Sequence, residues 1–248
     1  MQTLLHHCDP ERCLTDFWIG IYMLYKTRGI ALSYIRYRET SIIARIYTEL
    51  FGVQSYIVNG VRSAGARIQL VLFQPLNLLD LVVYHNRRSE LHRIREIKCP
   101  EPHISIPYSM RKTSLAIFLA EFLGKVLREE EENIPMFDFI RDSIAELDHC
   151  TGGTENFHIQ VLLRLAAWVG IAPGSAYALA REINSPVSTD ERLLEKLQEL
   201  MDSPYFSGPA LASGERNLLL DTLIQFYSHH FDQLGEIKSL DVLREVLR

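Results

Sequence analysis

The chain has 248 residues, of which 47% are apolar and 23% charged, a composition that excludes a disordered chain and fits one large or two small domains. The net charge of −5 does not by itself point to a polyanionic partner. The charge is uneven, however: residues 23–98 carry twelve Lys and Arg against five Asp and Glu, whereas residues 99–248 carry thirteen against twenty-three. This split predicts two domains with different partners, and the clustered positive charge is typical of phosphate-backbone binding.

The four cysteines stand at positions 8, 13, 99 and 150 and do not resemble a disulfide framework, so we expect a reducing, cytoplasmic compartment. No apolar run reaches the ~20 residues that span a bilayer. The first residues also lack the basic region and long apolar core of a secretory signal. We therefore expect no membrane partner.

Residues 1–22 differ from the rest of the chain, because the polar HHCDPERC and the short apolar FWIGIY precede the first strand pattern. We expect Met23 to be the natural start and residues 1–22 to be an upstream extension. The alternative is a zinc site formed by the histidines and cysteines of residues 6–13. No second ligand pair follows at the usual spacing, so we predict no metal and no other cofactor.

Residues 24–98 show the alternation and the β-branched and aromatic content of strands. Turn signals divide them into five strands, with a basic loop at 63–67, and Pro75 implies an edge, bulge or bend in the fourth strand. Five consecutive strands with short turns favour a small closed barrel, and about 75 residues is the size class of the OB-fold. The expected strands span 26–38, 41–49, 53–62, 68–85 and 91–98.

Two prolines within Cys99-Pro-Glu-Pro-His103 predict a domain boundary, and helical periodicity follows it, first over 114–127. Residues 171–188 are rich in Pro, Gly, Ser and Ala and predict an irregular connection. The predicted fold is α+β multidomain: an N-terminal five-stranded OB-fold β-barrel over 23–100 that binds nucleic acid, followed by an all-α helical domain over 101–248. Further helices are expected over 135–148, 154–169, 189–201, 214–231 and 239–247.

The barrel segment supplies cations and aromatic rings, the two groups that hold single-stranded nucleic acid. Strict alternation places Tyr34, Arg36 and Arg38 on one face, which we expect to face solvent, and Ile35 and Tyr37 on the packed face. Any single arginine has the simpler interpretation of a solvated strand face, but the excess of charge favours a collective role. The DNA-binding candidates are Lys26, Arg28, Tyr34, Arg36, Arg38, Arg45, Arg62 and Arg67.

The second strand alternates in the same way. Ile42, Ala44 and Ile46 are expected in the core, which leaves Ile43, Arg45 and Tyr47 outside.

Cations at the two ends of the first long helix predict a groove for an acidic tail peptide of a partner, in which apolar residues would lie beside charge. The alternative is that the helix residues Phe118 and Phe122 are simply core. The candidates for this tail site are Arg111, Lys112, Lys125 and Arg128.

Five phrases together resemble the bacterial DNA repair protein RecO, of the recombination mediator family: GIALSYIRYRETSIIARIYTELFGVQSYIVNGVR, LFQPLNLLDLVVYH, LHRIREIKCPEPHISIP, RKTSLAIFLAEFLGKVLREEEEN and SLDVLREVL. The resemblance runs from about Met23 to the C-terminus. It implies an OB-fold and a helical domain that bind single- and double-stranded DNA and anneal complementary strands. It also implies that the protein acts with RecR to load RecA onto DNA coated by single-stranded-DNA-binding protein, whose acidic C-terminal tail it contacts.

One feature departs from this family. Many members carry a four-cysteine zinc site, whereas this chain has no CxxC pair and no cysteine after Cys150, so the resemblance also predicts no zinc.

Motifs of catalysis are missing, because nucleophile arrangements, a P-loop and carboxylate pairs at general-acid spacing are not found. The main hypothesis is therefore a non-enzymatic recombination mediator in DNA repair, cytoplasmic and nucleoid-associated. Two alternatives stay open. One is an RNA-binding OB-fold module, and the other is a protein-binding adaptor without direct DNA contact.

Overall fold

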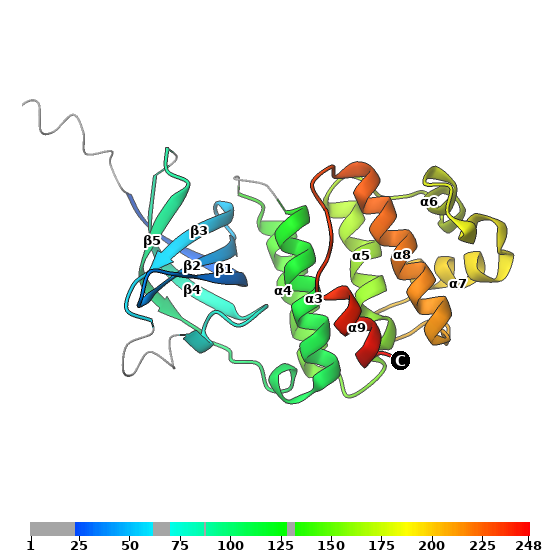
Figure 1. Cartoon of the computed structure of the whole chain (residues 1–248), viewed down its shortest axis with the longest axis horizontal. Coiled ribbons are helices and arrows are strands. Elements are labelled where there is room, and N and C mark those ends of the chain that lie inside the picture. The colour runs from blue at the N-terminus through cyan, green and yellow to red at the C-terminus, as the bar shows by residue number, and fades with distance from the viewer. Residues whose placement is uncertain (1–22, 62–69, 87, 128–131) are drawn as a thin grey trace, which may run out of the picture.

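The computed structural model describes residues 23–61, 70–86, 88–127 and 132–248. Figure 1 shows a small β-barrel beside a larger group of helices, with α3 and α4 between the barrel and the rest. The strands close in the order β1-β2-β3-β5-β4, the five-stranded Greek-key arrangement of the OB-fold. The predicted fold class, an OB-fold followed by helices, is confirmed. The strands are β1 (Met23–Tyr37), β2 (Ser41–Thr48), β3 (Gly52–Val58), β4 (Leu78–His85) and β5 (Leu91–Lys98).

The barrel core consists of the side chains that the second strand was expected to bury, together with apolar partners from the other strands. Ile42, Ala44 and Ile46 are fully buried, which confirms that prediction. Gly29 of β1 is required by close packing, because a Cβ there would lie 2.8 Å from side-chain atoms of Ile46 and Leu81.

The fourth strand is shorter than predicted, because residues 70–77 form turns before β4 begins. The backbone N–H of Leu76 donates to the carbonyl of Ala31, and the side-chain amide of Asn77 donates to the carbonyls of Val71 and Leu72. Phe73 and Leu76 are fully buried. The apolar run of this segment is therefore buried as turns instead of as a strand ladder.

A β-bulge between Ala31 and Ser33 changes which side of the first strand faces the core, although Tyr34, Arg36 and Arg38 are exposed as predicted. Tyr34 lies opposite Ala44 and Arg36 opposite Ile42, and directly opposed residues point to the same side of a sheet. Tyr34 and Arg36 therefore lie on the side of the core residues, at a rim where both side chains still reach solvent.

Ile35 and Tyr47 also differ from the sequence prediction. Ile35 was expected to pack, but it lies on the outer side of the hairpin and is 63% exposed. Tyr47 was expected outside, but it is 2% exposed, because its ring packs against Phe137 of α4 with the centroids 5.8 Å apart. Helix packing, which local alternation does not encode, decides the position of Tyr47.

The helical part contains all six helices that periodicity predicted, with ends that shift by a few residues. Residues 171–188 are a correction, because they contain a helix and a 3-10 turn. Ser175 and Ser185 cap these two elements by accepting from the backbone N–H of Ala178 and Val187. The helices are α3 (Met110–Val126), α4 (Ile134–His149), α5 (Phe157–Trp168), α6 (Ala176–Glu182), α7 (Glu191–Asp202), α8 (Ser213–His230) and α9 (Leu240–Val246), and the 3-10 turns are η1 (Ile106–Tyr108), η2 (Thr154–Asn156) and η3 (Pro186–Thr189).

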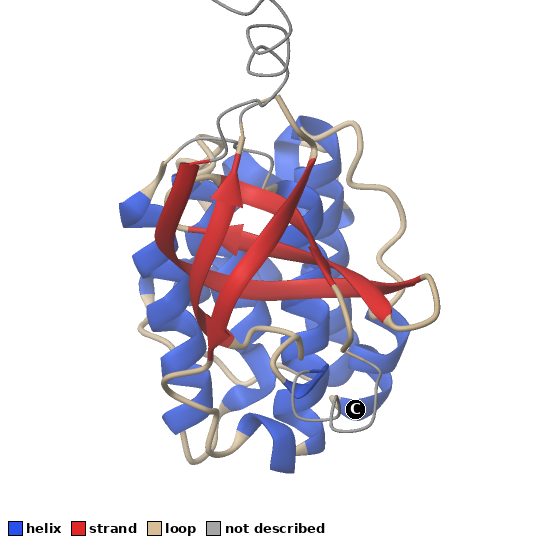
Figure 2. Cartoon of the chain, turned by 90° about the vertical axis from the view of Figure 1, so that its left-hand side faces the viewer, coloured by secondary structure: helices blue, strands red, loops and turns tan. Residues whose placement is uncertain are grey.

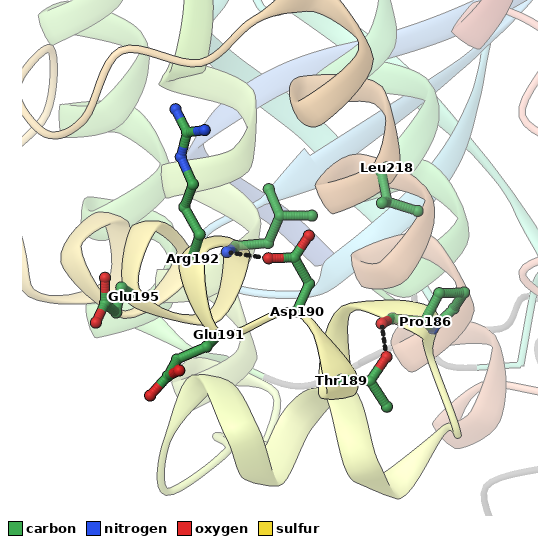
Figure 3. A pocket seen from close by; sticks show the side chains of 8 residues that line it. Pro186, Thr189, Asp190, Glu191, Arg192, Glu195 and Leu218 are labelled. Carbon is green, nitrogen blue, oxygen red and sulfur yellow. Dashed lines mark hydrogen bonds between the residues drawn. The ribbon is translucent and has the colours of Figure 1, made fainter.

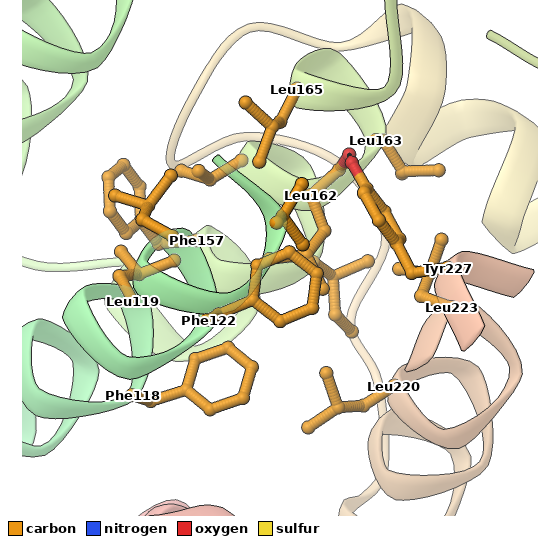
Figure 4. Packing of buried hydrophobic residues seen from close by; sticks show 14 of the residues in the cluster. Phe118, Leu119, Phe122, Phe157, Leu162, Leu163, Leu165, Leu220, Leu223 and Tyr227 are labelled. Atoms are coloured by element: carbon orange, nitrogen blue, oxygen red, sulfur yellow. Dashed lines mark hydrogen bonds between the residues drawn. The ribbon is translucent and has the colours of Figure 1, made fainter. Parts of the chain in front are cut away.

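An aromatic cluster joins α3, α5 and α8 (Figure 4). Phe118 and Phe122 are fully buried in it, so the interpretation of these two residues as core is correct. The ring of Tyr227 stands edge-on to Phe122 at 4.9 Å, and its hydroxyl donates to the carbonyl of Leu162 at 2.7 Å. In the described residues no helix is long and apolar enough to cross a membrane.

The barrel and the helices share one apolar core. Ile30, Leu32 and Tyr47 of the barrel belong to the same buried cluster as the helix residues. Figure 2 shows the strands lying in front of the helices, so one side of the barrel is covered and the opposite side faces away from the helical part.

Candidate nucleic-acid interface

The strand register places a row of side chains on the outside of the barrel that α3 and α4 leave open. Ile35, Ile43 and Ile57 oppose one another across β1, β2 and β3, and Arg93 of β5 continues the row. The adjacent row contains Arg45 between Ser33 and Ser55. We call Ile35, Ile43, Arg45, Ile57 and Arg93 the hairpin face.

The hairpin face combines exposed apolar surface with cations. Ile35 is 63% exposed, and Arg45 and Arg93 are exposed as well. Arg36 and Arg38 lie beside it at the β1–β2 turn, where Arg38 adopts a φ of 53° and its guanidinium lies 5.2 Å from the centroid of the Tyr37 ring. Strands 2 and 3 with their flanking loops are the part of an OB-fold that binds oligonucleotides, and this face occupies that position.

A second basic region lies across the barrel, on β1, β4 and β5. Lys26 shares its row with Val82 and Glu96, and Arg28 shares the next row with Asp80 and Lys98. These residues line a cleft of about 420 Å³. We call Lys26, Arg28, Asp80, Glu96 and Lys98 the mixed face, because cations and carboxylates alternate on it.

Arg28 is engaged within the protein. Its guanidinium lies 2.6 Å from a carboxylate oxygen of Glu49 and 3.0 Å from one of Asp138 in α4. The hydrogen bond to Glu49 is the main reason why the pKa of Arg28 is raised and that of Glu49 is lowered. Arg28 therefore joins the barrel to the helices, a role that the sequence prediction did not give it.

A groove opens at the end of the barrel where β1 begins and β4 ends, and its lining includes inner residues such as His92 and outer residues such as Arg45 and Ser55. β5 pairs with β3 from Ser55 onward, so the first residues of β3 have no partner on that side. The groove has a volume of about 1440 Å³. Arg45, Arg88, Glu90 and Glu132 are among the residues that line it.

Four rings form a continuous row in this groove. Phe51 stacks on His85 at a centroid distance of 3.9 Å, and His85 stacks on His92 at 4.5 Å. Tyr25 meets Phe51 edge-on at 5.1 Å. Burial, together with the neighbouring His85, lowers the pKa of His92 to about 4, so this imidazole is neutral at physiological pH. We call Tyr25, Phe51, His85 and His92 the ring row.

The sequence analysis did not single out the ring row, because its members come from three strands and one turn. A partial signal was available. His85 and His92 flank the turn that was predicted at 86–89, and residues on either side of a hairpin turn are cross-strand neighbours. The contribution of Phe51 depends on barrel closure and has no local signal.

The candidates for the tail site do not come together. Arg111 and Lys125 are fourteen residues apart on α3, which separates them by about 21 Å along the helix. Arg111 pairs with Glu155 at 2.7 Å, and the ammonium group of Lys125 donates to the carbonyls of Leu234 and Glu236. These contacts hold the helical part together, so among the described candidates Arg111 and Lys125 do not line one pocket.

Lys112 is a correction, because it is buried. Its ammonium group donates to Ser105 Oγ at 2.6 Å and to the carbonyls of Asp148 and Cys150 at 3.0 and 2.7 Å. It therefore fixes the linker to the end of α4 and is removed from the tail-site candidates. The candidates Arg62, Arg67 and Arg128, like residues 1–22, lie outside the described residues.

Another pocket lies in the helical part. A pocket of about 720 Å³ opens beside the start of α7, where Asp190 caps the helix and the side chains of Glu191 and Glu195 point apart (Figure 3). Within the part of the chain that the structure describes, no three His, Cys, Asp or Glu side chains are grouped to hold a metal ion, and Cys99 and Cys150 are free thiols.

Comparison with known proteins identifies the family. Residues 23–103 match the family described as "Recombination protein O N terminal", and residues 107–177 match "Recombination protein O C terminal". The chain belongs to the RecO family of DNA repair proteins. This confirms the resemblance and assigns the chain to DNA repair and recombination.

Curated relatives are similar over nearly their whole length. The chain is 36% identical over 242 residues to DNA repair protein RecO of Bacteroides fragilis, which covers 90% of this chain and 99% of that protein. The RecO proteins of Phocaeicola vulgatus and Flavobacterium psychrophilum are 34% and 32% identical, with the same shares covered.

Proposed function

We propose that this protein is a recombination mediator without catalytic chemistry of its own, which binds single- and double-stranded DNA through the hairpin face and anneals complementary strands. The observation that carries this proposal is the row of exposed Ile35 and half-buried Ile43 and Ile57, bordered by the exposed Arg45 and Arg93. Cations neutralise phosphates and release counterions, whereas apolar side chains offer contact to bases.

Annealing follows from the same surface. Two DNA strands repel each other through their phosphates, and this repulsion falls when arginine neutralises part of the charge. Base pairing then provides the driving force, so no nucleotide hydrolysis is needed.

We further propose that residues 23–100 contact DNA, whereas residues 101–248 contact proteins. The acidic excess of the second part disfavours DNA, because thirteen Lys and Arg face twenty-three Asp and Glu over residues 99–248. The partners proposed from the family are RecR, the C-terminal tail of single-stranded-DNA-binding protein, and RecA indirectly, with the nucleoid as the place of action. Of the tail-site candidates, Arg111 remains at the surface, with Glu155 as its partner.

The direct test is annealing of complementary oligonucleotides by the wild type and by Arg45→Glu/Arg93→Glu, which reverses the two cations of the hairpin face. We expect the charge-reversed protein to anneal at least tenfold more slowly, because two phosphate contacts become repulsive. Lys26→Glu/Lys98→Glu is the matched control, since it makes the same charge change on the mixed face. Equal loss in both variants, or no loss in the first, would show that the DNA lies elsewhere.

Binding to matched RNA and DNA strands separates this function from the two alternatives. Tighter binding to RNA would indicate the RNA-binding module. A protein that binds neither strand at low salt would instead be a protein-binding adaptor.

A further inference from the structure

We propose that the groove with the ring row receives an unpaired nucleobase of a single DNA strand whose phosphates lie on the hairpin face; this inference rests on the proposed DNA binding. Phe51, His85 and His92 already stack on one another, with the ring of Tyr25 edge-on to Phe51. A base is a flat ring of the same kind, so it can extend the row. Stacking of this sort tolerates every base, because each has a π-face.

The charges around the groove favour a base over a phosphate. The two cations Arg45 and Arg88 line it together with the two carboxylates Glu90 and Glu132. A phosphate gains little from such a balanced lining, whereas a neutral base meets acceptors and donors for its edge.

The position of the groove connects it to the hairpin face. Arg45 lines the groove and also belongs to the outer row of β2, with Ser33 and Ser55 on either side. A strand held by phosphate contacts on the hairpin face therefore passes the groove mouth. The volume of about 1440 Å³ exceeds the ~300–1,000 Å³ of a typical small-molecule site, which suits a segment of a polymer.

A neutral His92 is compatible with a nucleobase in the groove. His92 is 1% exposed and lies opposite Tyr56 on the inner side of the barrel. A neutral imidazole stacks as an aromatic ring and adds no charge that would draw a phosphate inward. The titratable and charged groups that face it around the groove are His85, Glu90, Glu132, Arg45 and Arg88.

The experiment measures binding of the full-length protein to two single strands of equal length, one with normal thymine bases and one in which the central nucleotides are abasic. Both strands carry the same phosphates, so their difference in affinity reports base contacts alone. We expect the normal strand to bind about tenfold more tightly. A strand with a single 2-aminopurine reports the stacking directly, because its fluorescence falls when the base stacks on a ring.

Variants locate the base contact. Phe51→Leu keeps an apolar side chain but removes the ring, and we expect it to lose most of the preference for bases and most of the quenching. Tyr177→Leu is the matched control, because Tyr177 is an exposed ring on α6, at the end of the helical part remote from the barrel (Figure 1). It is expected to keep both. Tyr25→Leu is the second variant if Phe51→Leu does not fold.

The possible negative results distinguish the proposed DNA binding from the proposed base contact. A wild type that binds neither strand overturns the proposed function, and this inference with it. A wild type that binds both strands equally overturns only the inference and leaves the groove to a partner protein. The inference is also overturned if Phe51→Leu and Tyr177→Leu quench the fluorescence alike.

Discussion

The barrel and the helical part both carry lysines and arginines, but they use them differently. On the hairpin face, Arg45 and Arg93 reach solvent beside the exposed Ile35 and the half-buried Ile43 and Ile57. In the helical part, the ammonium groups of Lys112 and Lys125 donate to backbone carbonyls of distant segments. The guanidinium groups of Arg45 and Arg93 are therefore accessible from solvent, whereas Lys112 and Lys125 are part of the scaffold. The count of charges along a sequence does not distinguish the two.

Two tyrosines of the barrel, one buried and one exposed, give the largest expected difference in the free energy of unfolding. Tyr47→Ala removes a buried ring that packs on Phe137, and we expect a loss of about 4 kcal/mol in the free energy of unfolding. Tyr34→Ala removes a ring that is 39% exposed and should cost less than about 1 kcal/mol. Urea unfolding of both variants tests this pair. Similar costs would contradict the packing of Tyr47 against α4.

Substitution of Lys112 is expected to give the next largest loss of stability. Lys112→Met removes the buried ammonium donor to Ser105 Oγ and to the carbonyls of Asp148 and Cys150, which we expect to lower the free energy of unfolding by about 3 kcal/mol. Arg93→Met on the hairpin face should change it by less than about 0.5 kcal/mol and weaken DNA binding instead. Thermal unfolding of the two variants tests this prediction. A Lys112→Met protein as stable as the wild type would mean that other contacts fix the linker to the end of α4.

A buried histidine predicts acid sensitivity in the helical part. Burial, with a smaller effect from Arg216, lowers the pKa of His158 to about 3, and neither ring nitrogen has a hydrogen-bond partner. The unfolded chain binds this proton near pH 6.5 and the folded chain does not, so the stabilisation is complete above pH 6.5 and is lost as the pH falls toward 3. The loss amounts to about 3 kcal/mol by pH 4.

His158→Leu tests this prediction, because leucine fills the site without a group to protonate. We expect the variant to lose less stability than the wild type between pH 7 and pH 4, as measured by urea unfolding. His229→Leu, at an exposed position, should follow the wild type. An unchanged pH dependence in His158→Leu would refute the assignment.

The ion pairs between the barrel and the helical part are expected to contribute less to the free energy of unfolding. Arg28→Met removes the ion pairs with Glu49 and Asp138, and because these side chains are partly exposed we expect a cost of about 1 kcal/mol. Lys26→Met, a neighbour on the mixed face, should be neutral in the same unfolding assay. A cost of zero for Arg28→Met would show that apolar contacts alone join the barrel to the helices.

Removal of residues 1–22 should have the smallest effect. The described ladder begins at Met23, which pairs with His85, so a chain that starts at Met23 keeps every described strand. We expect the truncated chain to have the same free energy of unfolding and the same affinity for DNA as the full chain. A truncated chain that fails to fold would contradict the interpretation of these residues as an extension.

Much of the fold followed from the sequence, because periodicity and turn residues act locally. Helix α3 and strand β5 are examples, since the spacing of their apolar residues and the residues that flank them predict both elements. The bulge after Ala31 did not follow, because a one-residue irregularity leaves no mark in the alternation, yet it moves Tyr34 and Arg36 to the other face.

The candidate site was harder to predict than the fold. Arg45 was expected at the surface and lies there. Arg28 and Lys112 are held by acceptors that are far away in the sequence, Asp138 and Asp148, so no local pattern could show that they are engaged. The groove likewise exists only because the barrel closes around it.

The salt dependence of DNA binding tests the central claim most directly. Arg45→Glu/Arg93→Glu on the hairpin face and Lys26→Glu/Lys98→Glu on the mixed face make the same charge change, so only the position differs. We predict that the hairpin-face variant loses affinity for single-stranded DNA and that its slope of log affinity against log salt falls by about two, while the mixed-face variant keeps the wild-type slope. Equal slopes in the two variants would contradict the assignment of DNA to the hairpin face.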